Sequence, residues 1–209
     1  MAGSYAELFC FSNFTFLTGA SHPHELAERA LELGYHAIAI TDACSVAGIP
    51  RAWAALKDSP VKLITGSWFE LEDAPAGAAT PRFILLAQSR KGYGQLCQLI
   101  TTGRRQAEKG QYQLFARDIE THELDHCLCL WQPPSTAAAS YEQAGACGEW
   151  LQRLFEQRLR IGATRTLEAG EEQQLARVRA LAEHLQLAVA ATGEVHMHAR
   201  ERQPLQDVL

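Results

Sequence analysis

Short apolar runs alternate along the chain with longer segments in which apolar residues recur every three or four positions. The apolar runs predict β-strands at residues 5–11, 36–41, 61–66, 82–88, 126–131, 158–164 and 187–192. The segments with helical spacing are residues 21–34, 45–59, 92–105, 141–157 and 171–186. Strands that alternate with helices predict a mostly parallel α/β sheet, but periodicity alone does not distinguish an open sheet from a closed barrel.

Turn and capping residues set the boundaries of several of these elements. Ser21 or His22 is the expected N-cap of the first helix, and Gly34 is its expected end. The stretch 67–81 is rich in Pro, Gly and Ala, so a loop is expected there. The third helical segment has a predicted buried stripe of Tyr93, Leu96, Cys97 and Ile100.

The composition is that of a globular protein. Of the 209 residues, 47% are hydrophobic and 21% are charged, which supplies enough apolar material for a core. No apolar run reaches the roughly 18 residues that a membrane span needs, and the first residues lack the pattern of a signal peptide. The six cysteines have no CxxC spacing, so we expect reduced, mostly buried thiols and a cytoplasmic location. Because no apolar run is long enough to span a membrane, we also expect no membrane partner.

The formal net charge of −5 argues against strong binding of nucleic acid by this chain alone, because such binding depends on neutralising phosphates. The charge is unevenly distributed, since residues 82–117 contain seven Lys and Arg but only one acid, Glu108. We interpret this basic segment as a solvated helix and loop face, with a partner-binding patch as the alternative.

Three side chains of the type that binds metals follow the last predicted strand: Glu194, His196 and His198. On an extended segment these alternate positions point to the same side, so the three could converge on one cation. The carboxyl ends of parallel strands are also where α/β folds keep their sites. Zinc or manganese, however, takes about four to six ligands, normally from several strand ends.

The other predicted strand ends supply few further ligands. Their side chains do not coordinate cations; they are Phe9, Phe11, Ala43, Trp68, Arg82 and Trp131. Asp42 is the exception, but an aspartate just before a helix more often caps that helix or forms local hydrogen bonds. A polar loop after the last strand is therefore the competing interpretation of residues 194–198.

Five longer segments occur in a recognisable order. They read "YAELFCFSNFTFLTGAS", "ALELGYHAIAITDACSVAGI", "VKLITGSWFEL", "FILLAQSRKGYGQLCQLITTGR" and "VAATGEVHMHARERQPLQDVL". In this order and spacing they resemble the N-terminal PHP (polymerase and histidinol phosphatase) domain of bacterial C-family DNA polymerases. The pattern AELxCxSNFxFLxGASHPxEL is similar to the error-prone, damage-inducible branch. The resemblance implies a distorted seven-stranded (βα)7 TIM-like α/β barrel, with residues 1–198 as the PHP domain and 199–209 as the start of the connection to the polymerase palm.

The resemblance also implies a site for up to three zinc or manganese ions, from which this sequence departs. The lost ligand positions are Phe9, Phe11, Ala43, Trp68 and Arg82, and a further one falls within residues 131–133. Glu194 and His196 match the final DxH of the family, and Asp42 and His198 are further candidates. We therefore expect no bound metal, no other cofactor and no catalytic residue in this chain.

The resemblance implies that the parent chain is a DNA-directed DNA polymerase that acts in DNA replication and repair, SOS mutagenesis and translesion synthesis. Its magnesium would be bound in a palm domain beyond residue 209. This domain would be a structural and protein-interaction module without its own hydrolase activity. Its expected partners are the palm and thumb of its own chain and mutagenesis accessory proteins, and it would meet DNA only through the full-length polymerase. The alternative is a metal-dependent phosphoesterase, a 3′–5′ proofreading exonuclease or a pyrophosphatase, with a rebuilt site of Asp42, Glu194, His196 and His198.

Overall fold

The computed structural model describes residues 5–135, 137–165 and 170–209, and the chain groups into two compact units. The first unit comprises the chain up to Ser67 together with Thr192–Leu209, and the second comprises Trp68–Ala191. The predicted domain 1–198 also includes residues 1–4, 136 and 166–169, which lie outside the described residues.

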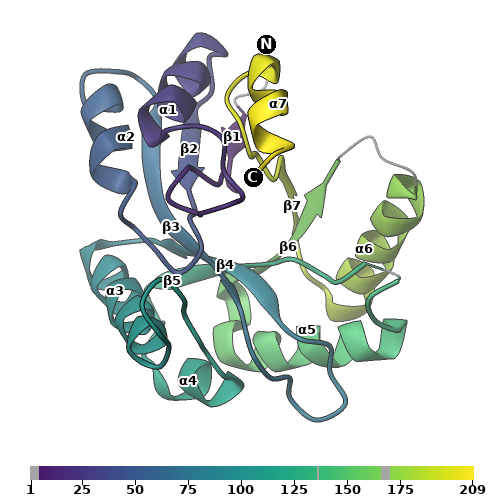
Figure 1. Cartoon of the computed structure of the whole chain (residues 1–209). Helices are drawn as coiled ribbons and strands as arrows, with labels where there is room; N and C mark the ends of the chain where they lie inside the picture. The colour runs from purple at the N-terminus through teal and green to yellow at the C-terminus, as the bar shows by residue number, and fades with distance from the viewer. Residues whose placement is uncertain (1–4, 136, 166–169) are drawn as a thin grey trace. The chain divides into compact units, whose positions relative to one another are not determined.

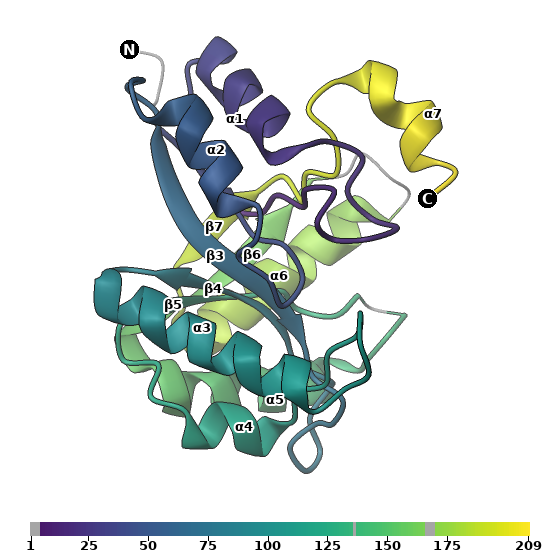
Figure 2. The same cartoon turned by 60° about the vertical axis from the view of Figure 1, so that its left-hand side comes forward.

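The first unit contains the beginning and the end of the chain. Its elements are β1 (Ala6–Glu7), α1 (Pro23–Glu32), β2 (Ala37–Ile40), α2 (Ile49–Leu56), the first part of β3 (Lys62–Glu70), the end of β7 (Val189–Thr192), a 3-10 helix (Arg200–Arg202) and α7 (Gln203–Gln206). Helix α1 packs against α2 and β2, as Figures 1 and 2 show. The core of this unit consists of Cys10, Leu26, Ala27, Ala30, Ile38, Ile40, Ala52, Leu56 and Val61.

Helix α1 begins and ends where the sequence predicts. His22 is the N-cap residue, and its backbone N–H donates to the Glu25 carboxylate at 2.8 Å. Pro23 occupies the first turn, where its missing N–H has no consequence. Gly34 follows the helix at φ +67°, a conformation that glycine adopts without strain.

The second unit contains the rest of the sheet and its helices. Its elements are the end of β3, β4 (Arg82–Ala87), α3 (Arg90–Arg105), α4 (Ala116–Thr121), β5 (Cys127–Trp131), α5 (Tyr141–Phe155), a 3-10 helix (Glu156–Arg158), β6 (Leu159–Thr164), α6 (Glu171–Leu185) and the start of β7. Helix α3 packs on β4 and β5, whereas α5 packs on β5 and α6. Phe83, Leu85, Leu130 and Trp131 are completely buried at the centre of these strands.

All seven strands belong to one sheet, in which each strand is the neighbour of the next one along the chain. The β1–β2, β2–β3 and β5–β6 pairs are parallel, whereas β4 and β5 are antiparallel. Beyond β1 and β7, a parallel bridge joins Cys10 to Val195. This connectivity confirms the predicted α/β class and the seven-stranded, TIM-like barrel type, and the antiparallel β4–β5 pair is its departure from a purely parallel sheet.

Three predicted details are wrong. The first strand, predicted at residues 5–11, comprises only Ala6–Glu7. Strand β3 continues to Glu70, so the loop expected at 67–81 begins later, because no Gly or Pro interrupts the residues that follow Ser67 before Pro75. The stripe predicted for α3 is also shifted around the helix. Leu96 is buried, but Tyr93 is 43% exposed, and the rest of the buried face is Gly92, Gln95, Leu99 and Gly103.

The cysteines and the helix lengths agree with the composition. All six cysteines are free thiols, and five of them are buried. Among the described residues, no helix has the length and apolar character needed to cross a membrane.

Candidate functional site

The segment after β1 carries two phenylalanines at alternate positions, in the first unit. The backbone N–H of Phe11 donates to the Val195 carbonyl at 2.8 Å, and the N–H of Val195 donates to the Phe9 carbonyl at 2.9 Å. Phe9 and Phe11 are only 2% and 5% exposed, and their rings meet edge to face with centroids 4.9 Å apart. These two positions therefore hold a packed aromatic pair, which has no lone pairs to offer a cation.

The imidazole of His196 packs onto this pair. Its ring centroid lies 5.4 Å from that of Phe11, in a tilted arrangement. Its Nδ1 lies 3.3 Å from the backbone carbonyl of Thr18, and a carbonyl can only accept, so Nδ1 must carry the hydrogen in this contact. The backbone carbonyl of His196 in turn accepts from the N–H of Ala20 at 2.8 Å. His196 thus holds the loop that follows the aromatic pair.

The carboxylate of Asp42 is completely buried and is occupied by hydrogen bonds. Its Oδ1 accepts from the backbone N–H of Ser12 at 2.7 Å and from the Thr15 hydroxyl at 2.8 Å. Its Oδ2 accepts from the Ser12 hydroxyl at 2.7 Å. Burial raises the pKa of Asp42, and the hydrogen bonds from Ser12 and Thr15 oppose this shift without reversing it. The hydrogen-bonding role that the sequence predicts is present, but the N-cap of α2 is Gly48 rather than Asp42.

The residue after Asp42 continues this network through its backbone. The N–H of Ala43 donates to the Thr15 hydroxyl at 3.0 Å, while the methyl side chain of Ala43 has no donor atom for a metal. The Asp42 carbonyl accepts from the Ser67 hydroxyl at 2.8 Å. The loops after β1 and β2 and the middle of β3 are therefore joined by direct protein hydrogen bonds.

His198 lies in a separate polar cluster at the start of α1. Its Nδ1 is 2.8 Å from the Ser21 hydroxyl, which also accepts from the N–H of His198 at 2.9 Å. Nδ1 is also 3.9 Å from Glu25, whose carboxylate forms an ion pair with Arg202 at 2.5 Å. Burial raises the pKa of Glu25, but the hydrogen bond from the His22 backbone N–H and the charge of Arg202 lower it by more, so the net direction is down. The sequence does not show this cluster, because its members are far apart along the chain.

The backbone of Glu194 contradicts the prediction that residues 194–198 form an extended segment. Its φ is +48°, in the left-handed region that residues other than glycine rarely adopt. The segment 194–198 is therefore not extended throughout, so the premise that alternate side chains share one side does not hold at Glu194.

A second buried carboxylate, Glu7, was missed by sequence reasoning. Its Oε1 accepts from the backbone N–H groups of Leu8, Phe9 and Gly193, each at 2.9 Å. Its Oε2 accepts from the Tyr5 hydroxyl at 2.7 Å, and burial together with this carboxylate raises the pKa of Tyr5. Glu7 thereby joins β1 to the end of β7, although a lone acid in a short strand carries no sequence signal of burial.

The remaining predicted positions lie in the second unit. Trp68 is half-buried in β3. The Arg82 guanidinium lies 3.9 Å from the Glu70 carboxylate, and the Arg82 carbonyl accepts from the N–H of Gln132 at 2.9 Å. Trp131 is completely buried at the end of β5. Trp68, Arg82 and Trp131 lack the oxygen, imidazole or thiolate donors that zinc or manganese prefers, and the Glu70 carboxylate beside Arg82 lies next to a cation.

The donor chemistry of the described residues does not fit the metal cluster that the resemblance implies. Across residues 5–135, 137–165 and 170–209, no group of three or more His, Cys, Asp or Glu side chains is arranged to hold a metal ion. Asp42 already accepts three hydrogen bonds, His196 is packed on Phe11, and His198 belongs to the Glu25 cluster. The structure therefore does not bring Asp42, Glu194, His196 and His198 together as one ligand set.

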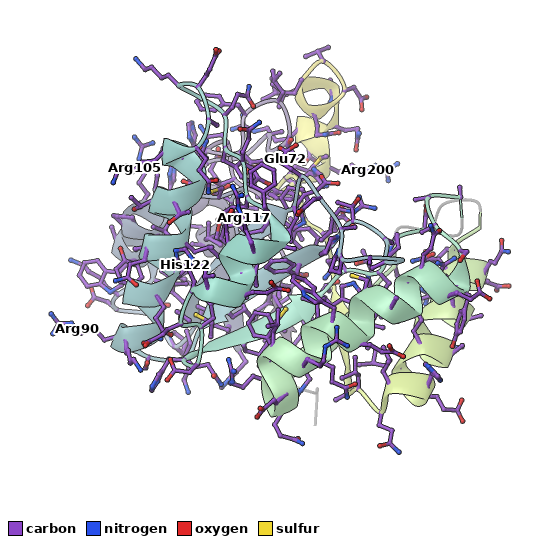
Figure 3. All side chains as sticks on the ribbon, turned by 90° about the horizontal axis from the view of Figure 1, so that it is seen from below. Glu72, Arg90, Arg105, Arg117, His122 and Arg200 are labelled. Atoms are coloured by element: carbon purple, nitrogen blue, oxygen red, sulfur yellow. The ribbon has the colours of Figure 1, made fainter. Side chains whose placement is uncertain are left out.

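The basic segment 82–117 does not form one continuous positive patch. Arg90 and Arg105 lie at opposite ends of α3, as Figure 3 shows. Acids from outside the segment lie among its cations: Lys91 pairs with Asp125 at 2.9 Å, and Arg117 lies 4.0 Å from Asp118. This arrangement favours the solvated face over the partner-binding patch.

Comparison with known proteins identifies relatives of the chain. The family model described as PHP domain matches residues 8–191. The error-prone DNA polymerase of Methylococcus capsulatus is 50% identical over 98% of this chain, and that of Pseudomonas aeruginosa is 46% identical over 99% of it. The chain spans only 18% and 19% of the length of these two relatives.

Solved structures share the fold at low sequence identity. A candidate metal-dependent phosphoesterase from Bifidobacterium adolescentis has a TM-score of 0.65 at 13% identity, covering 93% of this chain and 88% of that one. An amidohydrolase from Chromobacterium violaceum has a TM-score of 0.59, also at 13% identity and with the same coverage. At this level of identity the likeness concerns the fold alone.

Proposed function

The chain belongs to the PHP domain family, and from this premise we propose that it is the PHP domain of an error-prone DNA polymerase, with a structural and protein-binding role and no hydrolase activity of its own. The assignment to the polymerase rests on relatives that are 44–50% identical over nearly the whole chain. The loss of hydrolysis rests on the side chains that stand where the family binds metal.

One observation supports the loss of metal chemistry most strongly. Phe9 and Phe11, at the first two of the lost ligand positions that the resemblance implies, are buried against each other, and His196 packs on Phe11. A metal bound here would have to displace this packing, and its first two ligands would be absent. A full structural zinc site is worth on the order of 10–16 kcal/mol, most of which is lost with most of its ligands. Burying two aromatic side chains instead contributes roughly 1.5–3 kcal/mol each, so the fold persists without the ion.

In the parent polymerase, nucleotide addition would be carried out by the remaining four-fifths of the chain, with magnesium held by palm carboxylates as the resemblance implies. The PHP domain would support that catalytic part through contacts with the palm and thumb, and would contact DNA only as part of the full-length protein. This role agrees with the absence of a continuous basic face on the described part of segment 82–117.

The test measures metal content and hydrolysis on the same preparation. We expect less than about one zinc or manganese ion per chain by elemental analysis, and no release of nucleotides from a single-stranded DNA 3′ end when either metal is added. His196→Ala serves as the comparison, since it removes the best remaining ligand. Cleavage that the wild type performs and His196→Ala lacks would overturn the proposal and would favour a rebuilt phosphoesterase site.

The polymerase assignment is tested separately. The full-length protein that contains this domain should extend a primed template in the presence of magnesium and should bypass damaged template bases. A full-length protein with no nucleotide incorporation would contradict the assignment, whatever the result of the hydrolysis test.

A further inference from the structure

Two large apolar side chains stand out at the tip of the loop between β1 and α1. Phe16 is 81% exposed and Leu17 is 74% exposed. We call these two residues the apolar tip. Exposed apolar residues occur singly on most protein surfaces, but two adjacent ones of this size and exposure form a knob of the kind that fills a pocket on a partner.

The apolar tip rests on a rigid base. Thr15, directly before the tip, donates its hydroxyl to the buried Asp42 carboxylate. Its carbonyl accepts from the N–H groups of Thr18 and Gly19, at 3.2 and 3.1 Å, which closes the turn around the tip. A Cβ atom at Gly19 would lie 2.1 Å from the Ser12 carbonyl oxygen, so only glycine fits there. These contacts restrain the backbone at the base of the tip, which reduces the backbone entropy that would be lost when the tip binds.

The backbone at the tip is itself strained. Leu17 has a φ of +59°, in the left-handed region that residues other than glycine rarely adopt. On the other side, the Gln206 amide of α7 donates to the Thr18 carbonyl at 3.4 Å, and both Figure 1 and Figure 2 show this loop beside α7.

The net negative charge of the first unit favours a protein partner over a nucleic acid. The first unit has six Lys and Arg residues but nine Asp and Glu residues. One of the nearby cations, Arg51, is engaged over the Phe14 ring at 5.5 Å. An acidic unit gives little attraction for phosphates, whereas an apolar knob gains most from an apolar pocket.

We propose that the apolar tip is an anchor that docks this domain onto the remainder of its own polymerase chain. The inference rests on the proposed function. The match covers only 18–19% of the length of these relatives. If the parent chain is similar in length, the rest of it supplies a large surface that is covalently linked to this domain. Linkage gives that surface an effective concentration of about millimolar or more, at which a small contact is sufficient.

The size of the apolar tip argues against a second copy of the chain as its occupant. A stable dimer buries about 800 Å² on each partner. One aromatic and one aliphatic side chain supply only about half of that at most, since a whole buried aromatic covers roughly 150–250 Å². A two-residue knob therefore fits a tethered contact better than a free association.

The experiment is hydroxyl-radical footprinting of the full-length polymerase, with Trp53 as the internal control. Trp53 is 59% exposed on α2, close in accessibility to the tip. If the tip docks, Phe16 and Leu17 should be labelled about tenfold more slowly than their exposure in this domain predicts, as for the dry centre of an interface, whereas Trp53 should be labelled freely. Labelling of all three at rates that follow their exposure would overturn the inference.

A pair of variants tests the same contact by its energy. In the full-length protein, Phe16→Ser should increase the rate of protease cleavage between the PHP domain and the polymerase part by about fivefold or more, because loss of an anchor costs over 1 kcal/mol. Trp53→Ser should leave that rate unchanged. Equal rates for Phe16→Ser and the wild type, or protection of the tip that disappears on dilution as for a dimer, would overturn the inference.

Primer extension by the same preparations separates this inference from the proposed function. A polymerase that extends primers while Phe16 is fully labelled refutes the docking contact and leaves the function standing. A protein that shows no extension refutes the function itself.

Discussion

Removal of the Asp42 carboxylate should destabilise the chain more than any surface change. The variant is Asp42→Ala. Three donors, the Ser12 N–H, the Ser12 hydroxyl and the Thr15 hydroxyl, lose their acceptor at a position that is 0% exposed. The loop between β1 and α1 and the loop after β2 lose the three carboxylate hydrogen bonds between them and keep the bond from the Ala43 N–H to the Thr15 hydroxyl. Metal plays no part in this effect if Asp42 is a hydrogen-bond acceptor and not a ligand.

The magnitude follows from the orphaned donors. Each buried donor without a partner costs about 1–3 kcal/mol. Burial raises the pKa of Asp42, which means that part of this hydrogen-bond energy offsets the cost of burying the carboxylate. A net loss of about 3–5 kcal/mol is expected, which for a chain of this size lowers Tm by roughly 10 °C. Asp42→Asn should cost only about 1 kcal/mol, because the amide oxygen can replace Oδ1 and the Ser12 hydroxyl can turn to accept from the amide NH₂.

The assay is thermal unfolding followed by circular dichroism, with and without added zinc or manganese. Asp58→Ala is the matched control, since Asp58 is exposed in the loop after α2 and should change stability by less than about 0.5 kcal/mol. A wild-type Tm that rises by several degrees with metal, and does not rise in Asp42→Ala, would refute the reasoning and identify Asp42 as a ligand. An Asp42→Ala variant that melts with the Asp58→Ala control would refute it as well.

Two further changes test the other carboxylates. Gly193→Ala should lower the free energy of unfolding, measured in urea, by about 2–4 kcal/mol, because the new Cβ would clash with the Glu7 carboxylate and displace it. The control is Gly94→Ala in α3, which has open space around it and should be neutral or stabilising by up to about 1 kcal/mol. Equal stability of the two variants would contradict the role of Glu7. Glu25→Gln should cost under about 1 kcal/mol at pH 7, since its partner Arg202 is 38% exposed. Because folding lowers the pKa of Glu25, this contribution is present above the unfolded value of about 4.3 and is lost as the pH falls through the folded value. The difference in the free energy of unfolding between Glu25→Gln and the wild type, measured in urea, should therefore shrink at acid pH. A difference that grows at acid pH would be inconsistent with the ion pair. Glu28→Gln, on the exposed side of α1, is the control.

The strands and helices were largely predictable because their apolar spacing is strong. The run "HAIAIT" became β2 (Ala37–Ile40), and the segment 171–186 became α6 almost residue for residue. Periodicity carries no strand direction, so the antiparallel β4–β5 pair could not be predicted from it. In α3 the buried face includes Gln95, whose amide contacts Asp125 and the backbone of His126, and a polar residue does not contribute to an apolar stripe.

The candidate site was predictable only in part, for a different reason. Phe9 and Phe11 could be identified from the sequence as side chains that do not coordinate cations, but their burial against each other could not. The grouping of His198 with Ser21 and Glu25 depends on contacts across 177 residues between His198 and Ser21, which no local pattern encodes. Glu7 was missed because its burial depends on backbone N–H groups, and these are present at every residue and leave no mark in the sequence.

Glu7 and Asp42 together explain how the strand-end loops of the first unit can be ordered without a cation. A metal cluster organises such loops by attracting several ligands from different strands to one point. Here each carboxylate is one acceptor for several donors: Glu7 accepts from backbone N–H groups just after β1 and just after β7, and Asp42 accepts from Ser12 and Thr15 in the loop before α1. Both carboxylates already accept several N–H and O–H hydrogen bonds, which a cation would have to displace, so restoring a single lost ligand should not by itself restore metal binding. Restoring metal binding would require the lost ligands to be replaced and the hydrogen-bond donors around both carboxylates to be rearranged.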